Sequence, residues 1–377
     1  MVKAKFTRVK MEVFVVDPRP ELSKLSDYVP GKSIDEIRER YGLKNVIKLA
    51  SNENPLGASP RAVDAFHEIA DSLHLYPRGD APKLIDAIAQ RFGVKTNQVV
   101  VGNGSDEIID MVGKAFIRQG DNCIGVTPTF SVYKFTTLSN GAEFIGVGEG
   151  EEKTNLDDLA AKINDKTRVV FICNPNNPTG HYYNETEIRA FLAKVPKRVL
   201  VFLDEAYAEF ATASDFPKTV PMLSEFSNLF INRTFSKIYG LAGLRVGYAI
   251  ASEDVVRHMW KIKPPFDVNQ AAQVAAVAAF ADCDHVDATR KNNTIGISFL
   301  GDEFEKAGFK VLPTQANFIC VHLGERAKEL VSFLEQNGMI VRGLTSFGLP
   351  EYIRVTVGKP EENALLVSLV KKWVETA

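Results

Sequence analysis

Cysteine is scarce in this chain of 377 residues, which holds four widely separated cysteines. They are Cys123, Cys173, Cys283 and Cys320, and no Cys-x-x-Cys pair occurs, so neither a disulfide framework nor a zinc site is indicated. Isolated thiols are typical of a reducing compartment. Long apolar runs are missing too, since no segment approaches the ~20 residues of a membrane-spanning helix. We expect a cytoplasmic protein that binds neither a metal nor a membrane.

Two phosphate-binding signatures are absent or incomplete. No Gly-x-x-x-x-Gly-Lys-[Ser/Thr] motif occurs, which argues against a nucleoside triphosphatase. A dinucleotide-binding fingerprint would need a third glycine after Gly102 and Gly104, but Glu107 stands there. The charges nearly balance, with a net charge of −2 and a pI of about 6.4, so the chain shows no basic footprint for nucleic acid. Basic side chains gather before residue 11, where we expect an N-terminal arm.

The sequence does contain a regular alternation of two patterns. Short apolar runs, typical of buried strands, alternate with segments of helical periodicity. This alternation predicts an α/β fold with a largely parallel sheet covered by helices on both faces. The strand-like runs are 98–101, 122–126, 143–147, 168–173, 198–203, 229–233 and 246–251, and helical segments include 105–118, 185–193 and 270–281.

Lys237 is the most informative residue of the chain. It lies between the apolar stretch 229–231 and a segment rich in glycine and apolar residues. Such surroundings remove water from the amine and favour its neutral, nucleophilic form. Thr234 and Ser236 add hydroxyl groups, and Arg245 adds a fixed cation. These groups suit a phosphate tethered beside a Schiff base, which points to pyridoxal phosphate.

Two loops that follow predicted strands support this interpretation. The segment 174–180, which alternates asparagine and proline, follows one strand, and Asp204 ends another. Open α/β sheets bind their ligands at the carboxyl ends of strands. Taken alone, the first segment could be plain turn chemistry and the aspartate a helix N-cap. Their occurrence together with Lys237 favours a binding site.

With these motifs in order, the chain resembles the class I and II aminotransferases of fold type I, and within them it is most similar to histidinol-phosphate aminotransferases. The resemblance runs from about Tyr28 to the C-terminus. It implies a large domain with a mostly parallel seven-stranded sheet between helices, plus a smaller α+β domain. We place an N-terminal arm and a segment joining the small domain at 1–45, the large domain at 46–264 and the small domain at 265–377. The motifs that carry the resemblance are 49–57, 76–77, 102–107, 174–180, 204–207, 233–248, 317–318, 341–342 and 353–358.

The resemblance also implies roles for single residues. Lys237 would hold pyridoxal 5'-phosphate as a Schiff base and then serve as general base and acid, while Asp204 would keep the pyridine nitrogen protonated. Tyr207 and Asn177 would bind the phenolic oxygen of the cofactor. Phe130 would stack on the ring, where many relatives carry tyrosine. The cofactor phosphate would lie in a cup at the start of a helix, formed by Gly104, Ser105, Asp106, Thr234, Ser236 and Arg245.

For the substrate, the resemblance implies a phosphate held jointly by Arg342 and Arg354, because two guanidinium groups suit a dianion. Tyr28, Asn54 and Asn177 are expected to contact the substrate as well. Tyr76 would reach the cofactor phosphate of a partner chain, which implies a homodimer with shared active sites.

The expected reaction is the transamination of histidinol phosphate with 2-oxoglutarate to imidazole-acetol phosphate and glutamate, a step of histidine biosynthesis. Two alternatives share the fold: an aromatic amino-acid aminotransferase and a phosphothreonine-type decarboxylase. They stay open because the floor of the pocket comes from residues that the sequence does not identify.

Overall fold

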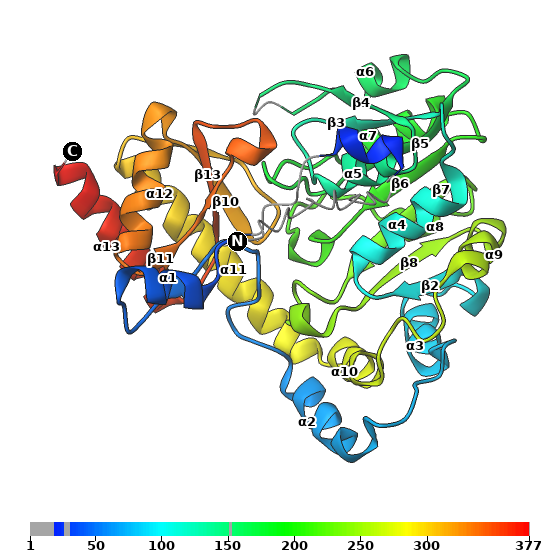
Figure 1. Ribbon diagram of the computed structural model, residues 1–377, viewed down its shortest axis with the longest axis horizontal. Coiled ribbons are helices and arrows are strands. Elements are labelled where there is room, and N and C mark those ends of the chain that lie inside the picture. The colour runs from blue at the N-terminus through cyan, green and yellow to red at the C-terminus, as the bar shows by residue number, and fades with distance from the viewer. Residues whose placement is uncertain (1–18, 26–30, 151–152, 377) are drawn as a thin grey trace, which may run out of the picture.

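The computed structural model describes residues 19–25, 31–150 and 153–376. The predicted N-terminal arm before residue 11 and the predicted substrate contact Tyr28 lie outside the described residues. Figure 1 shows two lobes, a larger one around a broad sheet and a smaller one that holds the C-terminal helices. Among the described residues, no helix is both long and apolar enough to cross a membrane, and no group of three or more His, Cys, Asp or Glu side chains is arranged to hold a metal ion.

The large lobe is built on a seven-stranded sheet with the order β2-β8-β7-β6-β5-β3-β4. Strand β8 runs antiparallel to both of its neighbours, and the other pairs are parallel. This confirms the predicted fold class, and each predicted strand lies within two residues of an observed one. The strands are β2 (Val99–Gly102), β3 (Asn122–Val126), β4 (Glu143–Val147), β5 (Thr167–Cys173), β6 (Leu200–Asp204), β7 (Leu229–Thr234) and β8 (Gly247–Ala251).

Helices cover both faces of this sheet. Successive side chains of a strand point to opposite faces, so Val169 and Phe171 of β5 join one hydrophobic cluster while Val170 and Ile172 join another. Burial on both faces explains why these strands are continuously apolar in sequence. The helices of the large lobe are α2 (Pro60–Glu68), α3 (Pro82–Phe92), α4 (Ser105–Phe116), α5 (Val132–Ser139), α6 (Leu156–Ala161), α7 (Glu185–Lys194), α8 (Thr219–Met222), α9 (Glu253–Ile262) and α10 (Gln270–Phe280).

The small lobe packs three helices on a four-stranded antiparallel sheet of order β12-β13-β10-β9. A short parallel pair of strands, β1 with β11, joins the N-terminal part of the chain to this lobe. Its helices are α1 (Ile34–Tyr41), α11 (Cys283–Lys306), α12 (Ala327–Gln336) and α13 (Pro360–Thr376), and its strands are β1 (Ile47–Lys48), β9 (Lys310–Leu312), β10 (Phe318–His322), β11 (Met339–Ile340), β12 (Arg342–Gly343) and β13 (Tyr352–Thr356). Short 3₁₀ turns lie at Pro20–Lys24, Ala70–Ser72, Thr96–Gln98, Ala208–Phe210, Ala242–Leu244, Gly324–Arg326 and Thr345–Phe347.

Helices α10 and α11 lie near the predicted domain boundary, and α11 connects the two lobes. Helix α10 packs on α2 and α3 and belongs to the core of the large lobe, although it follows residue 265. Helix α11 starts beside that core with Val286 and ends in the small-lobe core with Leu300 and Phe304, as Figure 1 shows. The boundaries predicted near residues 45 and 265 stay predictions.

Candidate active site

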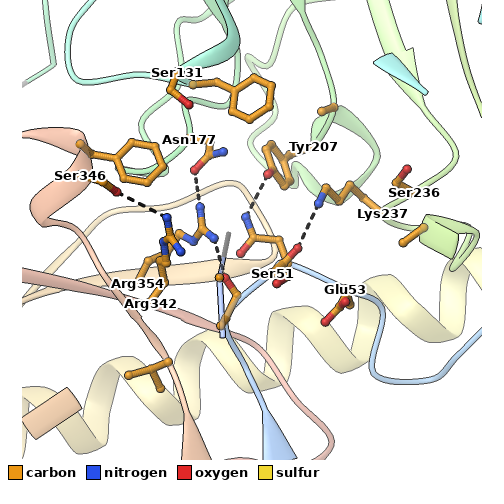
Figure 2. Close-up of a pocket in the computed structure, with 18 of the residues that line it drawn as sticks. Ser51, Glu53, Ser131, Asn177, Tyr207, Ser236, Lys237, Arg342, Ser346 and Arg354 are labelled. Atoms are coloured by element: carbon orange, nitrogen blue, oxygen red, sulfur yellow. Dashed lines mark hydrogen bonds between the residues drawn. The ribbon is translucent and has the colours of Figure 1, made fainter. Parts of the chain in front are cut away.

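A cavity of about 780 Å³ opens at the carboxyl ends of β5, β6 and β7, and the small lobe closes its other side. This edge of an open α/β sheet is where ligands bind, because the loops that leave parallel strands converge there. Most of the predicted site residues line the cavity: Ser105, Asp106, Phe130, Asn177, Asp204, Tyr207, Thr234, Ser236, Lys237, Arg245, Arg342 and Arg354. Figure 2 shows ten of the lining side chains by name.

Lys237 follows the end of β7 and reaches across the cavity. Its Nζ donates a hydrogen bond to the Ser51 carbonyl at 3.1 Å and lies 5.7 Å from the centre of the Tyr207 ring. Burial, together with the nearby positive charge of Arg354, lowers the pKa of the Lys237 amine to about 8. With this pKa, roughly a tenth of the amine is neutral at pH 7, far more than for an ordinary lysine, and the neutral amine is the form that attacks carbonyl carbons.

Asp204 is the last residue of β6 and is buried. Tyr133 donates its hydroxyl proton to Oδ2 at 2.6 Å, and Asn232 donates from Nδ2 to Oδ1 at 3.1 Å. Burial raises the pKa of the Asp204 carboxyl to about 6, while these two hydrogen bonds pull it the other way. The site thus holds a desolvated carboxyl group that would be stabilised as an anion by a cation placed in the cavity.

The start of helix α4 forms a cradle with the beginning of β8. A Cβ atom on Gly104, whose φ is +83°, would lie 2.4 Å from Arg245 Nη2, and one on Gly247 would lie 2.7 Å from the Ser105 amide nitrogen. No described side chain caps this helix, so its first amide groups stay free to bind an anion. The hydroxyl groups of Thr234 and Ser236 line the cavity close by.

Tyr207 and Asn177 both line the cavity. Asn52 donates from Nδ2 to the Tyr207 hydroxyl oxygen at 2.9 Å, so the hydroxyl proton is free to be donated elsewhere. Asn177 accepts from Arg354 Nη1. Phe130 lines the same cavity and meets the Tyr133 ring edge to face, with 5.7 Å between ring centres.

Arg342 and Arg354 are direct partners across strands β12 and β13. Arg354 is buried and donates to the Ala50 carbonyl at 2.7 Å, while Arg342 donates to the Ser346 hydroxyl at 3.4 Å. Within the described residues, neither guanidinium group forms a salt bridge, and the buried Nε of Arg354 has no hydrogen-bond partner. Two cations opposite each other on neighbouring strands destabilise a sheet. An anion bound between them would relieve this repulsion.

The segment that carries β1 into the cavity supplies four consecutive carbonyl groups as acceptors. Asn52 ends this row with a φ of +55°, a conformation that asparagine tolerates. The sequence analysis named the motif but not this role. The Leu49 oxygen accepts from the Thr356 amide at 2.9 Å, the Ala50 oxygen from Arg354 at 2.7 Å, the Ser51 oxygen from Lys237 at 3.1 Å and the Asn52 oxygen from Asn317 Nδ2 at 3.0 Å.

Two predicted contacts lie outside the cavity. Asn54 donates to the Ile238 carbonyl at 2.8 Å and to Thr289 Oγ1 at 3.1 Å, so it supports the lysine loop, while Asn52, two residues earlier, lines the cavity. Tyr76 is 83% exposed and stacks on Phe266 instead of reaching the cavity of its own chain. Other lining residues carried no sequence signal, because they are common residue types outside the motifs: Lys32, Ser131, Val331, Glu335, Thr345, Ser346 and Phe347.

Known proteins are similar to this chain in sequence and in fold. The sequence model of the family described as aminotransferase class I and II matches residues 44–369. The chain is 43% identical to histidinol-phosphate aminotransferase of Brevibacillus brevis over 96% of its own length and 100% of that protein, and 44% identical to that of Geobacillus thermodenitrificans over 92% and 94%. Its fold matches the crystal structure of histidinol-phosphate aminotransferase from Sinorhizobium meliloti in complex with pyridoxal-5'-phosphate, with a TM-score of 0.87, 24% identity and 99% of each chain covered. The chain belongs to the class I and II aminotransferase family.

Proposed function

We propose that this enzyme transfers an amino group between histidinol phosphate and 2-oxoglutarate, giving imidazole-acetol phosphate and glutamate, a step of histidine biosynthesis. The pair of Arg342 and Arg354 carries the substrate assignment, because each guanidinium group lacks an acidic partner among the described residues. The relatives named above, which bear the name histidinol-phosphate aminotransferase over nearly the full chain, support it.

The residues of the cavity fit pyridoxal 5'-phosphate as cofactor. The cradle between Gly104, Ser105 and Arg245 leaves no room for a Cβ atom and offers free amide groups, which suits a phosphate. Thr234, Ser236 and Asp106 would complete this cup. When bound, the cofactor supplies an electron sink and carries the amino group between the two substrates.

Five side chains would then do the protein's part of the chemistry. Asp204 would hold a proton on the pyridine nitrogen, since a cation there relieves the cost of its buried charge. Tyr207 would donate its free hydroxyl proton to the phenolic oxygen, beside Asn177, and Phe130 would cover the ring. Lys237 Nζ would accept the proton from the substrate Cα and deliver it to C4′ of the cofactor.

The other end of the cavity would receive the substrate phosphate. A dianion between Arg342 and Arg354 would remove the repulsion between the two guanidinium groups and pair both of them. An aromatic amino acid stays the second candidate, because Phe130 and Phe347 offer ring contacts in the cavity. The phosphothreonine-type decarboxylase is the third, since its substrate would also bring a phosphate to the arginine pair.

We further propose a homodimer in which Tyr76 reaches the cofactor phosphate of the partner subunit. Tyr76 is exposed, does not line its own cavity and stacks on Phe266, and Phe266 and the nearby residues Leu73 and Leu75 are exposed apolar side chains as well. Apolar side chains gathered on a surface are typical of an interface. A cytoplasmic location is consistent with the four free thiols at positions 123, 173, 283 and 320.

Replacing Lys237 with alanine is expected to abolish transamination. Among the described residues that line the cavity, the other lysine is Lys32, and its amine is paired with Glu335. Borohydride reduction followed by mass spectrometry should find the cofactor attached to Lys237 in the wild type and unattached in the variant. Circular dichroism checks that the variant folds. Turnover close to that of the wild type would contradict the assignment.

Replacing Asp204 with asparagine should change how stability depends on pH in the cofactor-free protein. The folded-state pKa of Asp204 is raised to about 6, so its contribution is fully present when the carboxyl is protonated and is lost as pH rises from about 4 through 6. The free energy of unfolding of the wild type should fall by about 3 kcal/mol relative to the variant over that range. Urea denaturation at a series of pH values measures this difference. A constant difference would refute the prediction.

Replacing Arg342 with alanine should weaken the use of histidinol phosphate selectively. Loss of one charged partner costs about 2 kcal/mol or more, so kcat/KM should drop roughly thirtyfold. The value for phenylalanine, which has no phosphate, should change little. Steady-state kinetics with both amino donors compares them. Equal losses, or a wild-type preference for phenylalanine, would favour the aromatic aminotransferase.

Mixing two inactive variants tests the shared site. If Tyr76 acts in the partner's site, a dimer of one Lys237→Ala chain and one Tyr76→Ala chain contains one site with both residues intact. Activity should therefore return when the two variants are unfolded together and refolded. No return of activity, or an active monomer in sedimentation experiments, would argue against the arrangement.

A further inference from the structure

Glu335 is a buried carboxylate that lines the cavity together with the arginine pair. It lies on α12, is 4% exposed and lines the same cavity as Arg342 and Arg354. Its neighbour Val331, one helical turn earlier, faces Gly343, because a Cβ atom on that glycine would lie 3.6 Å from Val331 Cγ2. Residues four apart share a helix face, so Glu335 faces the strand that carries Arg342.

The partner of Glu335 comes from the other side of the cavity mouth. Lys32 donates from Nζ to Glu335 Oε2 at 2.6 Å and also lines the cavity. It belongs to the segment just before α1, where Ser33 caps the helix by accepting from the Glu36 amide. A Cβ atom on Gly31 would lie 3.3 Å from Arg342 Nη1, so this segment passes directly over Arg342.

We propose that Lys32 is a positioning residue that occupies Glu335 and thereby keeps Arg342 free for the anionic end of the substrate. A buried carboxylate without a partner is costly, so without Lys32 the carboxylate would turn to the nearest cation on its face. Arg342 lies on the strand that this helix face meets and lines the same cavity, and its own described contact is a 3.4 Å hydrogen bond to Ser346. Glu335 would then compete with the incoming phosphate. The inference rests on the proposed phosphate site.

The charge argument predicts effects of different sign for the two partners. In the holoenzyme, Lys32→Met should weaken the binding of histidinol phosphate about tenfold, because Glu335 then competes with the substrate phosphate for Arg342. Glu335→Gln should bind it as well as the wild type or more tightly, since Lys32 is released toward the phosphate. The double variant Lys32→Met/Glu335→Gln should return to within roughly threefold of the wild type, because the competitor is gone.

The measurement is the apparent dissociation constant of histidinol phosphate in the amino-donor half-reaction, which excludes glutamate. The inhibition constant of inorganic phosphate in the same half-reaction gives a second readout and should follow the same order across the variants. Phenylalanine should be affected less than about twofold by any of them. Arg38→Met is the matched control, because Arg38 pairs with Asp35 on the exposed side of α1 at 2.6 Å.

Equal weakening by all three variants would overturn the proposal, since it would mean that the pair only fastens the segment before α1. Equal losses with phenylalanine would overturn it as well. If Lys32→Met does not fold, Glu335→Gln and the double variant still decide, because weaker binding in both contradicts the charge argument. If Arg342→Ala instead lowers kcat/KM equally for histidinol phosphate and phenylalanine, the proposed function itself is rejected. If Arg342→Ala selectively impairs the use of histidinol phosphate and Lys32→Met does not, the inference about Lys32 fails and the proposed function stands.

Discussion

A short stretch of backbone, residues 49–52, holds the two lobes and the reactive amine together. Its four consecutive carbonyl groups accept hydrogen bonds from Thr356, Arg354, Lys237 and Asn317. Two of these donors are cationic side chains on opposite sides of the cavity. Hydrogen bonds from charged donors are about twice as strong as neutral ones, and a buried site strengthens them further. The distance between the lysine and the arginine pair thus depends on the geometry of one backbone segment.

The fold and the cofactor end of the cavity were predictable because strong local signals coincide there. Buried parallel strands are continuously apolar, and several site residues at this end lie at the ends of such strands, as Asp204 ends β6 and Lys237 follows β7. Glycines that no Cβ atom could replace mark the cradle, as at Gly104 and Gly247. Pattern and chemistry therefore agree at the same positions, which makes single-sequence inference effective.

The substrate end was predictable only in part, since it is assembled from residues far apart in the chain. The arginine pair is visible as two separate arginines, but their pairing depends on the register of β12 and β13. Asn54 was expected to contact the substrate, but Asn52, which has a positive φ, lines the cavity and Asn54 does not. Lys32 and Glu335 are 303 positions apart and lie outside every motif. Tyr133, which holds Asp204, likewise depends on how α5 packs on the sheet.

Helix α11 gives the small lobe a mechanical property of its own. It runs without a break for 24 residues, with its first turns in the core of the large lobe and its last turns in the core of the small one. At 1.5 Å per residue it is a rod about 36 Å long. A tilt of about 5° at its beginning would carry its far end through about 3 Å. Because Leu300 and Phe304 pack in the same core as the sheet that bears the arginines, such a tilt would shift the arginine end of the cavity relative to the cofactor cradle.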